Sequence, residues 1–513
     1  MQNVSTINIR VAKNAIFLYA RTIVVLIVAL YTSRLLLLSL GDVDLGVFNL
    51  VGGIVALFFF LRSAQSKATS RFITYDIGKN ATDEQARKTF SACVSIHLLI
   101  AFVILIIGEI VGLWIVNHLI DIPIERYFAA NLVFQCALLN FCIKICQVPY
   151  EAVIIAHEEM YVVAYLAIAE ALIQLALILF LQQTHGDRLV LYGVLLLVEA
   201  CVLILLHIGY VKIKHKTYRC RLEWNNATCK RILSFSGWTI VGSSTNTLTQ
   251  QGVSILMNNF VGIIANTALG FANQVNGAVQ RFVGSFTTAF NPQIVKLYAQ
   301  GDSKRLKLLI NRSSKFSFVL AYLMALPLIM NMEFVLSVWL DHIPEYTTAF
   351  CQLILICSVI DATTGVYNTT ITATGDIKRY QISISLSFLL DVVCAYLLLS
   401  FSVNPVLVFG SRIFTRGILN GIIGLHFIKR KLNCSILGYC RSVLLPVTLT
   451  FIITFPVTTL ICQQTNGWIS LFSSTLINSV LCCVCTWLII CTKAERNGII
   501  EIVLNKLHQN ARK

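Results

Sequence analysis

Apolar runs of about 20 residues or more recur along the whole chain, separated by short polar connections. An α-helix rises 1.5 Å per residue, so a run of this length crosses the roughly 30 Å of hydrocarbon in a bilayer. No stretch long enough for an aqueous domain lies between the runs. We therefore predict an all-α polytopic membrane protein with about fourteen transmembrane helices. Their predicted ranges are 14–40, 45–62, 89–118, 127–155, 160–182, 189–211, 233–258, 262–290, 316–340, 346–373, 380–402, 405–428, 442–462 and 468–491.

The charge of the chain is consistent with this class. Charged residues make up 12% of the sequence, compared with about 25% in soluble proteins. The net charge of +16 could indicate a nucleic-acid partner, but most of the 40 Lys and Arg residues fall in connections on one side of the predicted helices. Cytosolic loops of membrane proteins are enriched in Lys and Arg. We therefore predict no nucleic-acid partner, an even number of spans, and N- and C-termini in the cytosol.

The sequence repeats itself at a spacing of about 220 residues. The segment 114–123 carries a Trp followed by Ile-Pro, as does 339–344, and 149–156 corresponds in the same way to 366–373. Two halves of six helices each enter from the same side, so they are parallel repeats with room for a cavity between them, as in transporters. We predict an N-lobe at 1–211, a basic cytosolic linker at 212–232, a C-lobe at 233–430, two additional helices at 431–491, and an amphipathic cytosolic tail at 492–513.

Six basic residues fall inside the predicted spans. They are Arg21, Arg34, Lys144, Arg281, Arg412 and Arg416. A charge at the bilayer centre costs about 3 kcal/mol or more, so each must face a wet cavity, pair with an acid, or extend to the membrane surface. Extension to the surface is an alternative for Arg34, near the outer end of its helix. Pairing is an alternative wherever an acid lies in a span, and the spans contain Glu109, Glu151, Glu170, Glu199, Asp361 and Asp391.

Arg412 and Arg416 are four residues apart and share one helix face. Two like charges on a buried face repel unless something anionic lies between them, which favours an anionic ligand over purely structural pairing. We therefore interpret the six cations as candidate substrate-binding residues.

Amide side chains are concentrated in two neighbouring predicted helices. The range 233–258 contains Asn246 and Gln250, and the range 262–290 contains Asn273 and Asn276. Lipid-facing helices do not accommodate so many amides. We predict that both helices, together with 14–40, line a cavity and that these four amides bind substrate there. The alternative is hydrogen bonding between helices without a cavity.

The segment Leu18–Gly53 resembles the start of a bacterial polysaccharide flippase. It has an early arginine, a second arginine near the outer end, and Leu-Gly-x-x-Asp-x-Gly-x-Phe over Leu40–Phe48. Such flippases belong to a superfamily that includes MATE-type multidrug exporters and the lipid II flippase. The resemblance matches Arg21 to a buried arginine of the first helix, and Arg281 to a cationic position in the eighth helix of the lipid II flippase branch. Fourteen helices also resemble that branch, whereas many polysaccharide flippases have twelve.

The resemblance implies a V-shaped transporter in the bacterial inner membrane. It would carry undecaprenyl-diphosphate-linked oligosaccharide to the outer leaflet by alternating access, for O-antigen, capsule or exopolysaccharide synthesis. The implied partners are that glycolipid, membrane lipid, a polysaccharide polymerase and chain-length proteins. It implies no cofactor beyond a coupling ion, H⁺ or Na⁺, for which Glu170, Asp361 and Asp391 are the candidates.

The chemistry of the residues is compatible with this substrate. Arginine presents a planar fork of donors that matches phosphate oxygens. A MATE-type multidrug exporter is the first alternative, although an organic cation needs an acidic or aromatic cavity. A membrane-embedded polysaccharide polymerase or glycosyltransferase is the second. The outer connections are short and hold no catalytic constellation, and no CxxC…CxxC or HExxH metal spacing occurs, so we predict neither an enzyme nor a metal site.

Overall fold

The computed structural model describes residues 4–56, 58–118, 122–219, 225–340, 342–432, 435–492 and 495–497. All regular structure in these ranges is helical. The helices are α1 (Val4–Ala56), α2 (Phe59–Gly78), α3 (Asp83–Ile107), α4 (Leu113–His118), α5 (Tyr127–Ala156), α6 (Met160–Gln183), α7 (Arg188–Lys214), α8 (Asn226–Phe260), α9 (Ile263–Gln300), α10 (Ser303–Met330), α11 (Met332–Trp339), α12 (Thr347–Thr374), α13 (Lys378–Ser400), α14 (Val406–Arg412), α15 (Asn420–Leu432), α16 (Ile436–Tyr439), α17 (Leu445–Gln464) and α18 (Gly467–Cys485). Most of the predicted tail at 492–513 lies outside the described residues.

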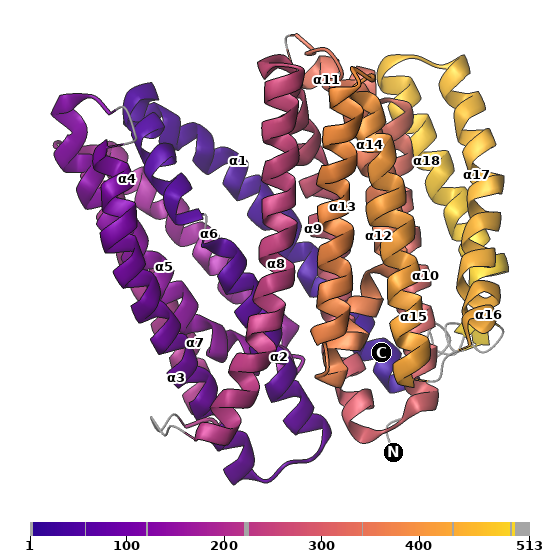
Figure 1. Ribbon diagram of the computed structural model, residues 1–513, viewed down its shortest axis with the longest axis horizontal. Helices are drawn as coiled ribbons and strands as arrows, with labels where there is room; N and C mark the ends of the chain where they lie inside the picture. The colour runs from indigo at the N-terminus through magenta and orange to yellow at the C-terminus, as the bar shows by residue number, and fades with distance from the viewer. Residues whose placement is uncertain are drawn as a thin grey trace, which may run out of the picture.

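The helices form two bundles that diverge from one end of the molecule (Figure 1). The first bundle consists of α1–α7 and the second of α8–α15, with α17 and α18 packed against α10 at its far edge. The bundles meet where α1 and α2 pack against α8 and α9. We call the end at which α2 and α9 finish the basic end, because the connections predicted to be cytosolic lie there.

The all-α membrane fold class is confirmed. Eleven helices in the described part of the chain are long and apolar enough to cross a membrane, and a bent pair, Val43–Val55 with Phe59–Gly78, is a twelfth candidate. The helices α8 and α9, with 35 and 38 residues, are long enough but are not among those eleven. Their many amide and hydroxyl side chains lower their hydrophobicity. With these two included, the described chain has a helix at each of the fourteen predicted positions.

The predicted spans 45–62 and 89–118 leave a connection between them, and this predicted connection is wrong over most of its length. Helix α1 contains a break at Gly41 (φ 74°), and after a bend of 48° the chain continues as the helix α2 to Gly78. The sequence of α2 is too polar to face lipid, yet Ala64, Ala68 and Phe72 are buried because α2 lies between the two bundles. Its basic residues therefore belong to a helix between the bundles and not to a loop.

At the basic end the two bundles make direct contact. A Cβ atom on Gly78 of α2 would lie 2.8 Å from Cβ of Ala299 and 2.9 Å from Cα of Lys296, both on α9. In the turn between α5 and α6, Glu158 accepts hydrogen bonds from Gln293 Nε2 (2.5 Å) and from Lys296 Nζ. These contacts join the first bundle to the second and hold the basic end closed.

We expect Gly78→Val to shift the protein towards a conformation open at the basic end. The added atoms would overlap the α9 backbone, and overpacking of this kind costs about 1–3 kcal/mol, or about 5- to 150-fold in a two-state equilibrium. The distance between spin labels placed on α2 and α9 should lengthen in the variant. Gly209→Val on α7, where an added Cβ meets nothing within 4 Å, is the control. Unchanged distances in the Gly78 variant would show that this contact does not hold the bundles together.

Candidate functional site

Three cavities lie along the facing sides of the helices and share lining residues. The central cavity, of about 440 Å³, lies between the bundles and is lined from α1, α2, α5, α6, α9 and α12. The second-bundle cavity, of about 500 Å³, is lined from α8, α9, α12, α13 and the α14–α15 region. The first-helix cavity, of about 590 Å³, is lined from α1, α6 and α9. Asn291 lines both the central and the second-bundle cavities, and Arg21 lines both the central and the first-helix cavities.

The central cavity is basic. Arg21 on α1 and Lys67 and Arg71 on α2 line it, and Glu151 is the acidic residue in its lining. Glu151 lies 3.5 Å from Arg62, so another cation already engages this carboxylate. Among the described residues, no carboxylate lies within ion-pair distance of Arg21, Lys67 or Arg71. The remaining lining is rich in serine and threonine hydroxyls, namely Ser63, Ser66, Ser70, Thr74, Thr288, Thr369 and Thr372.

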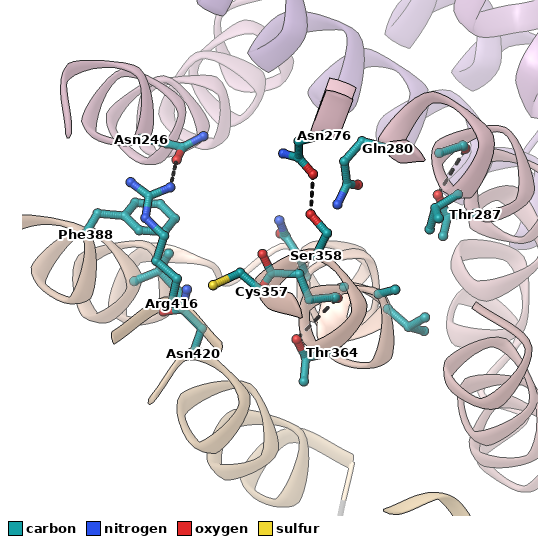
Figure 2. A pocket seen from close by; sticks show the side chains of 18 of the residues that line it. Asn246, Asn276, Gln280, Thr287, Cys357, Ser358, Thr364, Phe388, Arg416 and Asn420 are labelled. Carbon is teal, nitrogen blue, oxygen red and sulfur yellow. Dashed lines mark hydrogen bonds between the residues drawn. The ribbon is translucent and has the colours of Figure 1, made fainter. Parts of the chain in front are cut away.

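The second-bundle cavity is lined by amides (Figure 2). Ser358 of α12 donates a hydrogen bond to Asn276 Oδ1, as Figure 2 shows. The predicted binding residues Asn246, Gln250, Asn273 and Asn276 all line this cavity, so the structure brings them together. The other amide-bearing residues in its lining are Gln280, Asn291, Asn368 and Asn420. Each amide offers both donors and acceptors, as the binding of hydroxyl-bearing molecules requires.

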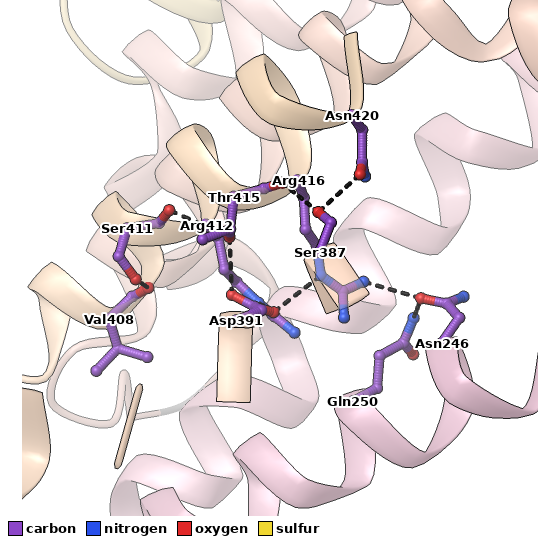
Figure 3. A network of polar contacts seen from close by, with 10 residues as sticks. All are labelled: Asn246, Gln250, Ser387, Asp391, Val408, Ser411, Arg412, Thr415, Arg416 and Asn420. Carbon is purple, nitrogen blue, oxygen red and sulfur yellow. Dashed lines mark hydrogen bonds and ion pairs between the residues drawn. The ribbon is translucent and has the colours of Figure 1, made fainter. Parts of the chain in front are cut away.

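A buried carboxylate binds both arginines of the predicted like-charged pair (Figure 3). Asp391 on α13 is 0% exposed and accepts from Arg412 Nε at 3.0 Å and from Arg416 Nε at 2.9 Å. Arg416 Nη1 also donates to Asn246 Oδ1 at 2.9 Å. An acid of the protein therefore lies between the two guanidinium groups, where the sequence favoured an anionic ligand. Two cations still share one anion, and Arg416 Nη2 is buried without a hydrogen-bond partner.

The other predicted cations are dispersed. Lys144 pairs with Glu170 at 3.1 Å, between α5 and α6. Arg281 and Glu170 line the first-helix cavity together with Arg21. Arg34 is exposed and lines none of the three cavities, which agrees with extension towards the membrane surface. Arg34 thus lies apart from the other site residues, and Lys144 is connected to them through its ion pair with Glu170.

The acids proposed for ion coupling have three different environments. Glu170 is paired with Lys144, and Asp391 is enclosed by Arg412 and Arg416. Asp361 on α12 lines the second-bundle cavity, and no cation lies within ion-pair distance of it in the described part of the chain. No group of three or more His, Cys, Asp or Glu side chains among the described residues could hold a metal ion.

The sequence prediction missed Lys67 and Arg71, because it placed both in a connection. A pattern that could have revealed them is present. Ser63, Ser66, Ser70 and Thr74 recur at helical spacing, and Lys67 follows the same face. This polar stripe is the side of α2 that lines the central cavity.

At the basic end, the imidazole of His157 stacks on His215, with ring centroids 4.1 Å apart. Burial, followed by the positive charges of His215 and Lys296, lowers the pKa of His157 to about 4, although the nearby Glu159 and Glu158 act in the opposite direction. The pKa of the folded state lies below the ordinary value of about 6.5. Neutral His157 therefore contributes stability above pH 6.5, which is lost as the pH falls from 6.5 towards 4.

We expect the melting temperature of the purified protein to fall over this pH interval by a few degrees more than that of the His157→Gln variant. Glutamine keeps a polar group near the Tyr218 hydroxyl, which lies 3.3 Å from His157 Nε2, but does not titrate. Thermal unfolding of both proteins between pH 7.5 and pH 4 would measure the difference. Equal acid sensitivity of the two proteins would contradict the assignment of the effect to His157.

The two diverging bundles with a central cavity are the fold of a MATE transporter. A crystal structure of MATE in complex with MaD3S superposes with a TM-score of 0.72 and 14% sequence identity, over 83% of this chain and 96% of that chain. An outward-facing multidrug resistance MATE family transporter of the MOP superfamily superposes with a TM-score of 0.69 and 13% sequence identity, over 82% of this chain and 96% of that chain. At such identities the similarity establishes the fold and not the substrate.

The MatE family model matches residues 239–397, which run from α8 to α13. A further structural match is a MOP superfamily transporter from Pyrococcus furiosus, in which the reverse polarity of the binding pocket suggests a different function. Its TM-score is 0.71 at 13% identity, over 82% of this chain and 97% of that chain. No curated protein sequence matches the chain.

Proposed function

We propose that the protein is a flippase that moves a polyprenyl-diphosphate-linked oligosaccharide from the cytosolic to the outer leaflet by alternating access. The observation that carries this proposal is the charge of the central cavity. Arg21, Lys67 and Arg71 line it, and Glu151, the acidic residue among the described residues of its lining, is engaged by Arg62. A cavity with this excess of cations selects an anionic cargo and repels organic cations.

The central cavity supplies the binding chemistry for a diphosphate. Lys67 has no ion-pair partner among the described residues, and the guanidinium group of Arg21 has no carboxylate within ion-pair distance. Charge-assisted hydrogen bonds from such groups to phosphate oxygens are among the strongest in proteins. The cavity also lies between two helix bundles, and their low dielectric strengthens the attraction between opposite charges.

The second-bundle cavity would receive the sugars. It shares Asn291, Asn368 and Thr369 with the central cavity, so a headgroup bound through its phosphates is in reach of the amide-lined walls. Amides and hydroxyls there can exchange hydrogen bonds with sugar hydroxyls. The polyprenyl chain would stay in the bilayer throughout, since only the polar headgroup needs a polar path.

Release would occur at the end where the bundles diverge, since contacts through Gly78 and Glu158 close the basic end. Return to a conformation open at the basic end would reload the cavity. If an ion drives the cycle, Asp361 is the candidate we favour, because Glu170 and Asp391 already have cationic partners.

A MATE-type multidrug exporter is the second candidate. The MatE match over residues 239–397 and the acidic Asp361 in the second-bundle cavity favour it. Three cations in the central cavity argue against it, since an organic cation would have to pass them. The transporter fold weighs against the polymerase or glycosyltransferase alternative.

The two candidates can be separated with purified wild-type protein in liposomes. We expect a fluorescent polyprenyl-diphosphate-linked oligosaccharide, initially distributed equally between leaflets, to become accessible to an impermeant external quencher beyond the outer-leaflet half. Ethidium preloaded into the same vesicles should stay inside under H⁺ or Na⁺ gradients. Ethidium export without movement of the labelled lipid would establish the exporter and refute the flippase.

A further inference from the structure

A second basic pocket opens at the basic end, on the side of α2 that faces α8 and the α12–α13 turn. This basal pocket, of about 420 Å³, is lined by residues that include Arg71, Arg231, Phe235, Trp238, Gly375 and Lys378. It therefore gathers three cations and several aromatic rings from elements far apart in the sequence. Arg71 also lines the central cavity, so its guanidinium group lies between the two spaces.

Arg71 is the innermost cation of the basal pocket. It is 4% exposed, and its Nη2 donates to the carbonyl oxygen of Ala373 at 3.1 Å. Its Nε is buried and has no hydrogen-bond partner. The guanidinium group also lies against Gly375, where a Cβ atom would come within 2.5 Å of Nη2. A buried, incompletely satisfied guanidinium group is costly unless an anion lies close to it.

The other two cations line the pocket from its exposed side. Arg231 lies over the Phe72 ring, 5.5 Å from its centroid, and Lys378 lies over the Trp238 ring at 5.2 Å. Both are exposed, and neither has a carboxylate within ion-pair distance in the described part of the chain. Aromatic rings orient the two side chains without neutralising them. Tryptophan and long basic side chains are also typical of the membrane–water interface.

Among the described residues of the pocket lining, the carboxylate belongs to Asp376, and it does not cancel this charge. Asp376 bonds to Lys431 Nζ, so a cation outside the lining already compensates it. Helix α13 begins at Lys378, beside the pocket. The residue that precedes it, Ile377, has no side-chain acceptor for the free backbone N–H groups of the first turn of α13. Free N–H groups at a helix N-terminus attract anions, so they add to the attraction that the three cations exert.

We propose that the basal pocket is a binding site for a phosphate group at the membrane surface, held by Arg71, Arg231 and Lys378. Either a phosphate ester, as in a lipid headgroup, or a free phosphate ion has the chemistry that this site would recognise. Its position among interfacial side chains favours the headgroup of an anionic lipid over a soluble ion. This site does not depend on which cargo is carried, because it is defined by binding and not by transport.

The test uses the delipidated full-length protein in detergent, with bound lipid measured by native mass spectrometry. Phosphatidylglycerol should form one adduct that is about tenfold tighter in the wild type than in the double variant Arg231→Gln/Lys378→Gln, because two charged contacts are lost. The variant Lys79→Gln/Lys304→Gln removes the same charge from exposed residues of the same end and should bind as the wild type. Phosphatidylcholine serves as the lipid without net charge.

A parallel titration with inorganic phosphate distinguishes the two sources. Phosphate that displaces the phosphatidylglycerol adduct, with the same dependence on Arg231 and Lys378, would support the site with a soluble ligand. Failure of phosphate to displace the lipid would support the headgroup. Equal losses in both double variants, or equal affinity of the wild type and Arg231→Gln/Lys378→Gln, would overturn the proposal. The liposome experiment on the cargo can fail without affecting this result.

Discussion

Replacing Arg21 by alanine should reduce translocation of the lipid-linked oligosaccharide by about 10- to 100-fold, while the protein reaches the membrane in normal amounts. The expected size of this reduction follows from the loss of charge-assisted hydrogen bonds from Arg21 to phosphate, in a cavity where few other cations can make such bonds instead. Arg21 is the one predicted cation that lines both the central and the first-helix cavities. Initial rates in the liposome assay measure the effect directly.

Two matched variants make this prediction specific. Arg34→Ala removes the same charge from the same helix at an exposed position outside the cavities, and should leave transport unchanged. Arg21→Lys keeps the charge but loses the bidentate geometry, so an intermediate rate is expected. The central cavity does not bind the diphosphate if Arg21→Ala transports at the wild-type rate, or if Arg34→Ala reduces the transport rate as much as Arg21→Ala does.

Replacing Asp391 by asparagine should destabilise the protein by about 3–5 kcal/mol, because it leaves two buried arginines without their shared anion. The carboxylate is 0% exposed and accepts from Arg412, Arg416 and the Thr415 hydroxyl. Chemical or thermal unfolding of the purified variant in detergent would measure the loss.

The control for this variant is an exposed ion pair of the second bundle. Asp376 pairs with Lys431 at the surface, so Asp376→Asn should cost only about 0–1 kcal/mol. Adding Arg412→Gln to Asp391→Asn removes one uncompensated cation and should recover part of the lost stability. A small effect of Asp391→Asn, or no recovery in the double variant, would show that Asp391 is not the main anion of the network.

The membrane fold was predictable because the property that specifies it is local. Hydrophobic length and helical rise can each be read within one segment, and the distribution of Lys and Arg needs only a count over the connections. The amide-rich helices α8 and α9 were also predicted correctly as helices, although they are not among the eleven spans chosen by length and apolar character. Polar side chains of both helices line the second-bundle cavity, so the helices do not need to be apolar on that face.

The partners of the buried charges were not predictable in the same way. Asp391 is 21 residues from Arg412 and 25 from Arg416, beyond the reach of any pattern on a single helix. The position of α2 shows the same difficulty, since its polarity suggested a loop and its place between the bundles depends on packing between helices.

The sequence alone determined that the chain crosses a membrane many times as helices. It also determined that the spans carry basic residues that cannot simply face lipid. The tertiary structure decided which cations are neutralised and which remain available. It paired Arg412 and Arg416 with Asp391, left Arg34 exposed, and placed Arg21 in the lining of the same cavity as Lys67 and Arg71. The physical reason is range. Hydrophobic length acts within a helix, whereas the pairing of charges depends on distances between helices that are fixed only when the bundles pack.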